Sequence, residues 1–232
     1  MKNKYWKIFL LSFSAILIVI VIIYKNYLHT LVPFSNSNYK IRGIDISHYN
    51  QIYNWDLVKS KNSFCIMKAT EGNTINDRRF NNSWDISKKL NMTRGAYHFF
   101  KSNSSAEVQF ENYRNSVKLV ANDLPPILDV ENADIDMKDV NLWLEMAEKY
   151  YGVKPIIYSS YYFFVRYMKG KVNNYPVWLY YNTKYKLRPA FDANEVLFLQ
   201  YSQHGKVNGI YGDVDLDLFL GDNEKFKQLL IK

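Results

Sequence analysis

The segment PPILDVEN, residues 125–132, carries the pattern from which we predict the fold. Its apolar pair Ile127-Leu128 leads directly into Asp129-Val130-Glu131. Successive side chains of an extended strand alternate between two faces, so Asp129 and Glu131 would point the same way. Two carboxylates on one face of a buried strand repel each other and lose hydration. Such a pair at the end of a strand therefore indicates a functional site.

This segment is one of a series of short β-rich runs. The series is 42–47, 63–69, 94–100, 125–131, 154–160, 175–181, 195–202 and 213–219. Helix-like stretches lie between several of them, at 77–92, 104–121 and 137–152, where the last one ends at Gly152, a plausible C-cap. The alternation predicts an α/β fold, a parallel TIM-like (β/α) barrel of about eight strands and five helices. Because loops separate the last three strands, we expect an irregular barrel.

Active sites of such barrels lie at the C-terminal ends of the strands. The polar and aromatic residues at these ends are Asp45, Lys68, Tyr97, Asp129, Glu131, Tyr158, Trp178, Gln200 and Asp215. Crowded carboxylates raise one another's pKa, which keeps one of them protonated as a general acid. Aromatic rings offer flat faces to sugars. This layout is typical of a glycoside hydrolase. We interpret Asp213 as a loop residue, and Asp217 as either a loop residue or a second carboxylate of the last strand.

Several of these residues also have a purely structural interpretation. A single aspartate at a strand end often caps the next helix or loop. Lys68 could neutralise Glu71 or Asp45 as an ion pair inside the site. The paired carboxylates of Asp129 and Glu131 are harder to explain by structure alone.

The sequence contains no metal or cofactor signature. His48 and His98 lack a His-x-x-x-His type of spacing, so we expect hydrogen-bonded scaffold residues rather than metal ligands. The only cysteine, Cys65, lies in an apolar run and predicts a buried structural thiol, without an intrachain disulfide. We expect no metal and no cofactor.

Length and charge limit the architecture and the partners. The 232 residues suffice for one domain of barrel size. The net charge of +8 is a mild bias toward anionic polymers, but no basic stripe is interleaved with aromatics, so we exclude nucleic acid as a partner. We expect a monomer.

The N-terminal segment predicts export. An uncharged, mostly apolar run at 8–24 follows several lysines, and as a helix it would rise about 26 Å, close to the hydrocarbon core of a bilayer. We predict a signal anchor (transmembrane helix) over 1–25, a linker over 26–40 and a barrel domain over 41–232, with the barrel outside the cytoplasm. A cleaved signal peptide, and thus a secreted protein, is the alternative, although no small-x-small cleavage site follows the run.

Seven motifs in order resemble the muramidases of glycoside hydrolase family 25. They are GIDISHYNQIYNW (43–55), IMKATEG (66–72), RGAYHFF (94–100), ILDVEN (127–132), PIIYSS (155–160), VWLYY (177–181) and LQYSQHGKVNGIYGDVDLDLF (199–219). The resemblance covers about 41–222. It implies an irregular (β/α) barrel that cleaves the β-1,4 bond after N-acetylmuramic acid in peptidoglycan.

The resemblance also implies roles for individual residues. Glu131 matches the general acid, and Asp129 matches the partner that positions or stabilises the 2-acetamido group. Asp45 and Asp215 match the other acidic residues of the cleft. The substrate-binding positions are Lys68, Tyr97, Tyr158, Trp178 and Gln200. A retaining, substrate-assisted reaction is favoured, and direct inversion stays open.

The sequence departs from the family pattern at several positions. Asp217 stands where the family usually has asparagine, Leu199 replaces a common tryptophan, and Tyr53 replaces isoleucine. None of these changes removes a predicted catalytic carboxylate. Two other functions remain open at this point: a non-catalytic glycan-binding module that kept the groove, and a chitinase-like hydrolase of N-acetylglucosamine polymers.

Overall fold

The computed structural model describes residues 6, 12–22, 31–172, 174–183, 187–192 and 195–232. The chain divides into two compact units. The smaller unit consists of Met1–Phe34 with Thr183–Ala190, and the larger one of Ser35–Asn182 with Phe191–Lys232.

The smaller unit contains a helix and a pair of short strands. Residues 12–22 are helical, with exposed apolar side chains, and β1 (Leu31–Pro33) pairs antiparallel with β10 (Leu187–Pro189). Within the described ranges, no helix combines the length and apolar character needed to cross a membrane. The predicted anchor over 1–25 falls partly on 1–5, 7–11 and 23–25, which lie outside the described residues.

The larger unit is built around a closed barrel, as predicted. In the described part of the chain its eight strands are β2 (Arg42–Ile46), β4 (Phe64–Glu71), β6 (Thr93–Phe99), β7 (Ile127–Asp129), β8 (Ile156–Ser160), β9 (Val177–Tyr180), β11 (Val196–Gly205) and β13 (Val214–Phe219). They neighbour one another in this order, and β13 returns to β2. The short strands β3 (Gln51–Ile52) and β12 (Ile210–Tyr211) pair with each other, and β5 (Ile75–Asn76) pairs with β4.

The last strand corrects the prediction of a parallel barrel. β13 runs antiparallel to both of its neighbours, β11 and β2. Only residues 206–213 join β11 to β13, and a parallel connection needs a crossover of roughly a dozen residues or more. The N-terminal end of β13 therefore lies at the rim where the other strands end, and Asp215 is the register partner of Asp45.

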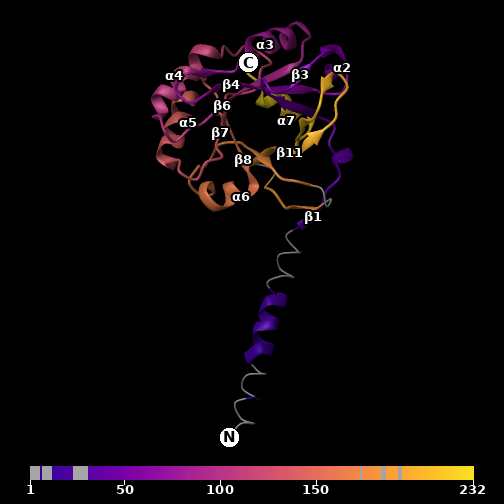
Figure 1. The fold of residues 1–232 in the computed structure, drawn as a ribbon, viewed down its shortest axis with the longest axis vertical. Helices are drawn as coiled ribbons and strands as arrows, with labels where there is room; N and C mark the ends of the chain where they lie inside the picture. The colour runs from indigo at the N-terminus through magenta and orange to yellow at the C-terminus, as the bar shows by residue number, and fades with distance from the viewer. Residues whose placement is uncertain (1–5, 7–11, 23–30, 173, 184–186, 193–194) are drawn as a thin grey trace. The chain divides into compact units, whose positions relative to one another are not determined.

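The helices α3, α4, α5 and α6 lie outside the ring of strands (Figure 1). The helical elements of this unit are η1 (Asn36–Asn38), α2 (Trp55–Lys59), α3 (Phe80–Lys89), α4 (Ala106–Ser116), α5 (Met137–Tyr151), α6 (Tyr161–Phe163), the π-helical η2 (Phe164–Met168) and α7 (Asn223–Leu229). They outnumber the predicted five because α2, α6 and η2 are too short to show a helical period. α5 ends as predicted at Gly152, whose φ of 71° suits glycine.

Alternation along the strands separates two hydrophobic layers. On β4, Phe64 and Ile66 belong to the interior cluster, whereas Cys65 and Met67 belong to the cluster that includes the helices. Gly43 on β2 leaves room for the Phe64 ring, because a Cβ there would lie 2.3 Å from it. Aromatic and aliphatic side chains together fill the interior. Polar residues take the inward positions at the C-terminal ends of the parallel strands.

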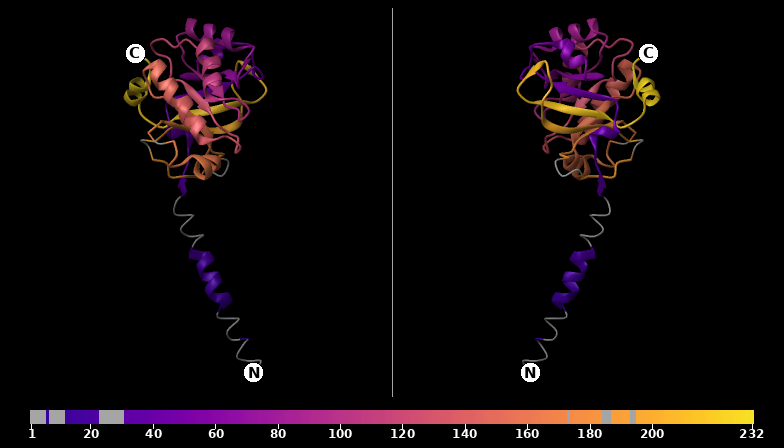
Figure 2. Two further views of the ribbon diagram at one scale, coloured as in Figure 1. Left: turned by 90° about the vertical axis from the view of Figure 1, so that its left-hand side faces the viewer. Right: turned by 90° about the vertical axis from the view of Figure 1, so that its right-hand side faces the viewer.

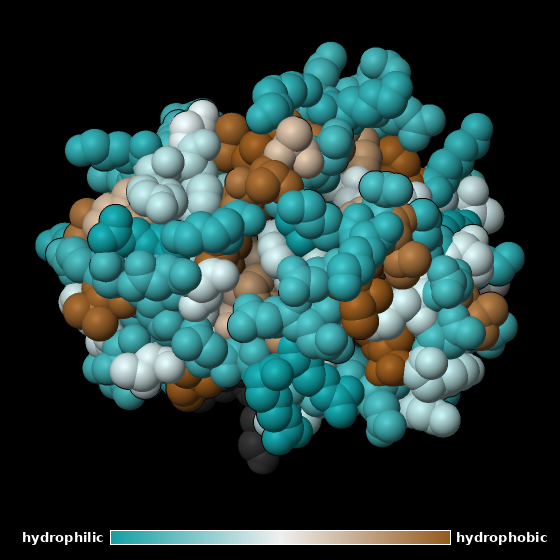
Figure 3. Space-filling view, turned by 90° about the horizontal axis from the view of Figure 1, so that it is seen from above, coloured by the Kyte–Doolittle hydropathy of each residue, from teal (hydrophilic) through white to brown (hydrophobic). Residues whose placement is uncertain are grey.

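The two ends of the barrel unit carry different elements. The turn that joins β11 to β13 and the C-terminal helix α7 lie at opposite ends (Figure 2). The face seen in Figure 3 is mostly hydrophilic with separate apolar patches, which is ordinary for an exposed protein surface.

Candidate active site

One pocket of about 210 Å³ brings together all the site residues that the sequence predicts. Its lining includes Asp45, Lys68, Tyr97, Asp129, Glu131, Tyr158, Trp178, Gln200 and Asp215. They occupy inward positions next to the interior cluster: Lys68 follows Ile66 by two residues, and Asp129 follows Ile127 in the same way. The pocket therefore lies at the predicted rim.

The pocket also contains Ser47, which follows Asp45 at the end of β2. Three further members were not indicated by the sequence: Tyr49, Phe99 and Gln203. Phe99 lies two residues after Tyr97 on β6, so strict alternation would have indicated it. Tyr49 is 83% exposed and follows the end of β2 in a turn, where no periodic pattern operates.

Asp129 and Glu131 differ in their surroundings. Asp129 is buried, and its Oδ1 has no hydrogen-bond partner among the described residues. Burial, followed by the charge of Glu131, raises the pKa of Asp129 well above its usual range. The Glu131 side chain reaches solvent at the mouth of the pocket. Desolvation by the surrounding protein atoms, followed by the charge of Asp215, raises the pKa of Glu131.

A chain of hydrogen bonds crosses the floor of the pocket. The Tyr158 hydroxyl donates to Gln200 Oε1 over 2.8 Å, and Gln200 Nε2 donates to Asp45 Oδ2 over 2.6 Å. Burial and the neighbouring charges of Asp217 and Asp215 raise the pKa of Asp45. Burial raises the pKa of Asp215 to about 6. The hydrogen bond from Gln200 acts in the opposite direction and lowers the pKa of Asp45, but burial and the neighbouring charges outweigh it.

The structure decides between the two interpretations of Asp217 in favour of the strand. It lies within β13 and is 0% exposed. Its Oδ1 accepts a hydrogen bond of 2.9 Å from Trp178 Nε1, whereas its Oδ2 is buried and has no hydrogen-bond donor among the described residues. The sequence left both interpretations open because β13 follows a tight turn, and three aspartates near a turn are typical of a loop. Asp213, by contrast, lies outside β13 and is exposed.

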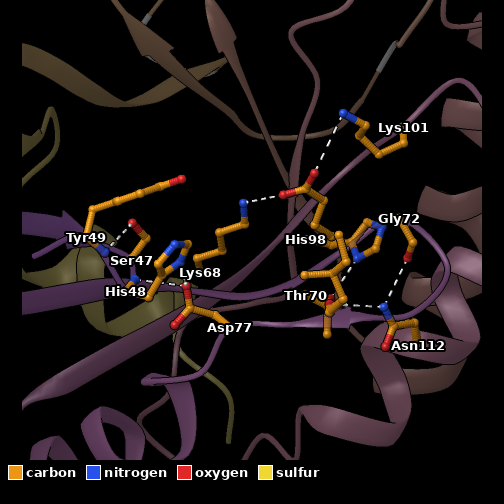
Figure 4. Close-up of polar contacts among 12 residues, drawn as sticks. Ser47, His48, Tyr49, Lys68, Thr70, Gly72, Asp77, His98, Lys101 and Asn112 are labelled. Carbon is orange, nitrogen blue, oxygen red and sulfur yellow. Dashed lines mark hydrogen bonds and ion pairs between the residues drawn. The ribbon is translucent and has the colours of Figure 1, made fainter.

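Two lysines meet one carboxylate beside the pocket (Figure 4). Lys68 Nζ lies 2.6 Å from Glu71 Oε2, and Lys101 Nζ lies 3.6 Å from Glu71 Oε1. Partial burial acts to raise the pKa of Glu71, but the two lysines outweigh it and the pKa is lowered. Both ammonium groups lie over the Phe99 ring, at 5.0 and 5.4 Å. The predicted ion pair of Lys68 with Glu71 is thus present.

The histidines and the cysteine near the site have structural partners. His48 Nδ1 lies 2.8 Å from Asp77, and His98 Nδ1 lies 2.7 Å from the Thr70 hydroxyl (Figure 4). Burial lowers the pKa of His98 to about 4, so this imidazole is neutral at physiological pH. Cys65 is buried, as predicted. Among the described residues, no group of His, Cys, Asp or Glu is arranged to hold a metal ion.

Comparison with known proteins identifies the family. Residues 44–210 match the family described as glycosyl hydrolases family 25. The chain belongs to this family. It is therefore a glycoside hydrolase.

The family 25 chain resembles both bacterial sequences and solved structures. The YegX protein of Escherichia coli (strain K12) is 36% identical over 202 residues, which cover 82% of this chain and 74% of YegX. Lysozyme M1 of Streptomyces globisporus is 28% identical over 212 residues, covering 83% of this chain and 71% of the lysozyme. The structure of a family 25 glycosyl hydrolase from Bacillus anthracis superposes with a TM-score of 0.75 at 28% identity, covering 84% of this chain and 96% of the other.

Proposed function

We propose that this family 25 hydrolase is an N-acetylmuramidase, which cleaves the β-1,4 bond between N-acetylmuramic acid and N-acetylglucosamine in peptidoglycan. The observation that carries the proposal is the single pocket in which Glu131, a carboxyl with a raised pKa at the mouth, lies with the buried Asp129. The similarity to a bacterial protein named a lysozyme supports the choice of substrate.

Glu131 acts as the general acid in the proposed reaction. Its raised pKa favours the protonated form that donates to the glycosidic oxygen as the bond to the anomeric carbon breaks. The departing sugar takes up this proton. In the second half of the reaction the resulting Glu131 carboxylate accepts a proton from the attacking water, which returns the enzyme to its starting state.

Asp129 assists through the substrate's own 2-acetamido group. The free Oδ1 of Asp129 is an acceptor buried in the pocket, and an acetamide N–H would satisfy it. The acetamide carbonyl oxygen then forms a bond to the anomeric carbon, and water opens the resulting ring, so the anomeric configuration is retained. Direct inversion by water is the competing course.

The aromatic lining provides binding for the sugar rings. Tyr158 and Trp178 have ring centroids 4.4 Å apart, and both line the pocket with Tyr97. Flat aromatic faces present apolar surface to the C–H groups of a pyranose. Lys68, held by Glu71, adds a positive charge at the same pocket.

Mass spectrometry of the fragments released from purified peptidoglycan tests the proposed bond specificity. We expect fragments with N-acetylmuramic acid at the reducing end. Fragments that end in N-acetylglucosamine, or faster release from chitin oligomers than from peptidoglycan, would contradict muramidase activity and favour a chitinase-like substrate. The anomer formed first, read by proton NMR, separates retention from inversion.

We also propose that the N-terminal segment tethers the barrel to the outer side of the membrane, so that it acts on nearby wall. The uncharged run at 8–24, preceded by lysines, supports the tether. We expect the full chain in the membrane fraction, with an intact mass that includes residue 1. A soluble exported protein that lacks the first 25 or so residues would instead indicate a cleaved signal peptide.

A further inference from the structure

Asp217 is a buried carboxyl that the proposed reaction does not use. It lies beneath the pocket, which it does not line. Asp217 lies two positions after Asp215, the register partner of Asp45, so its side chain is on the same face of the sheet and next to that of Asp45. Trp178 Nε1 donates a hydrogen bond of 2.9 Å to Asp217 Oδ1. One side chain thus holds two residues of the pocket lining.

The link between two carboxyl groups needs a proton. Gln200 Nε2 already donates to Asp45 Oδ2, so the other oxygen of Asp45 is the one available to carry a proton toward Asp217. Asp217 Oδ1 accepts from Trp178, which leaves its Oδ2 as the free acceptor. The contacts therefore fit a neutral Asp45 that donates to a negatively charged Asp217.

The surrounding groups favour a shared proton over two separate charges. Titratable and polar side chains surround the pair: Tyr97 on β6, Tyr158 on β8, Trp178 on β9, Gln200 on β11 and Asp215 on β13. The Cys65 thiol is near the pair but lies on the other face of β4. Burial is the largest influence on both carboxyls and raises the pKa of each, and the charge of Asp215 acts in the same direction. Lys68, the cation of this pocket, is paired with Glu71.

We propose that Asp217 is a positioning residue that shares one proton with Asp45, orients Asp45 and Trp178 in the pocket, and thereby sets the pH range of hydrolysis. The activity part of this inference rests on the proposed function. The shared proton itself does not, because it is a property of the folded protein.

The variant Asp217→Asn separates geometry from charge. The asparagine Oδ1 can still accept from Trp178, but its amide N–H must donate to Asp45, which reverses that hydrogen bond and favours an ionised Asp45. Asp217→Leu removes both contacts. Asp213→Asn is the matched control, because Asp213 lies on the same hairpin, is exposed, and pairs with Lys206.

Two measurements on the full-length protein test the proposal. The first measurement is the rate of reducing-end release from peptidoglycan as a function of pH. We expect D217N to lose the shared proton at lower pH than the wild type. The limb of the pH profile that reports this proton should therefore shift to lower pH by about one unit or more. D217L should lose kcat/KM about tenfold or more at every pH. D213N should follow the wild type.

The second measurement is the melting temperature from pH 4 to pH 8, which needs no substrate. The folded wild type holds a proton that both aspartates lose in the unfolded chain above about pH 4, so its stability should fall as the pH rises. D217N should melt a few degrees above the wild type at pH 7.5, roughly 3 °C or more, and this difference should vanish near pH 4. Asp45→Asn should reduce the dependence of the melting temperature on pH in the same way. This variant provides the test if D217N fails to fold.

The two measurements distinguish a failure of the proposed function from a failure of the shared-proton inference. If none of the proteins hydrolyses peptidoglycan, the proposed function fails, and the melting series still decides whether the proton is shared. If the melting temperatures of D217N, D45N and the wild type change with pH in the same way, the inference is overturned. An unchanged pH profile in an active D217N would overturn it equally.

Discussion

Replacing Glu131 with glutamine is expected to lower the rate of peptidoglycan hydrolysis by a factor of about 10² to 10⁴. The amide keeps the size of the side chain but has no proton that it can transfer to the glycosidic oxygen. Wild-type activity should also fall as the pH rises through the raised pKa of Glu131, because only the protonated form is the acid. Reducing-end release from purified peptidoglycan measures both effects.

Asp134→Asn is the matched control for this variant. Asp134 is an exposed carboxylate only three residues away, outside the pocket lining. We expect D134N to keep wild-type rates and E131Q to keep wild-type binding to insoluble peptidoglycan. Equal rates of hydrolysis by E131Q and the wild type would show that Glu131 is not the general acid. Binding without turnover by every form, wild type included, would support a glycan-binding module instead.

Replacing Asp123 with alanine is expected to destabilise the barrel by about 3–5 kcal/mol. Arg94 is 3% exposed at its side chain and Asp123 is 5% exposed. Arg94 Nε donates to Asp123 Oδ1 over 2.7 Å, and its guanidinium lies 3.8 Å from the centre of the Trp84 ring. The alanine variant would leave a buried, uncompensated positive charge. Thermal or urea unfolding should show the loss, on the order of 10 °C in Tm.

The exposed pair of Arg114 and Glu111 provides the comparison. Its atoms are as close, at 2.5 Å between Arg114 Nε and Glu111 Oε2, but the side chains are 38% and 49% exposed. Water replaces the lost partner at such a site, so Glu111→Ala should leave Tm almost unchanged. A similar loss in both variants would mean that burial does not decide the strength of these ion pairs. An unchanged Tm in D123A would show that the Arg94 charge finds another partner.

Much of the barrel was predictable because each parallel strand combines a local β-rich run with alternating faces. Phe64 and Ile66 lead along one face of β4 to Lys68, and Ile127 leads to Asp129 on β7 in the same way. A local period thus indicates both which residues form the interior and where the polar ones begin. Most pocket members from these strands were identified for that reason, and Phe99 on β6 and Gln203 on β11 are the exceptions.

Other features depend on contacts that no local pattern records. The antiparallel direction of β13 follows from the short connection after β11, and the pairing of Asp215 with Asp45 joins residues from the two ends of the barrel. Tyr49 enters the pocket from a turn, and Asp217 is buried because Trp178 and Asp45 lie against it. The apolar period at 8–24 likewise predicts a helix but does not state whether it is cleaved.

The sequence by itself determined the eight strand positions, the order of the family motifs and the identity of the carboxyl groups, because these follow from alternation and composition within short segments. Only the tertiary structure decided which carboxyls meet and how dry their surroundings are. Both depend on closure of the barrel, because closure pairs β2 with β13 and buries Asp45 and Asp217.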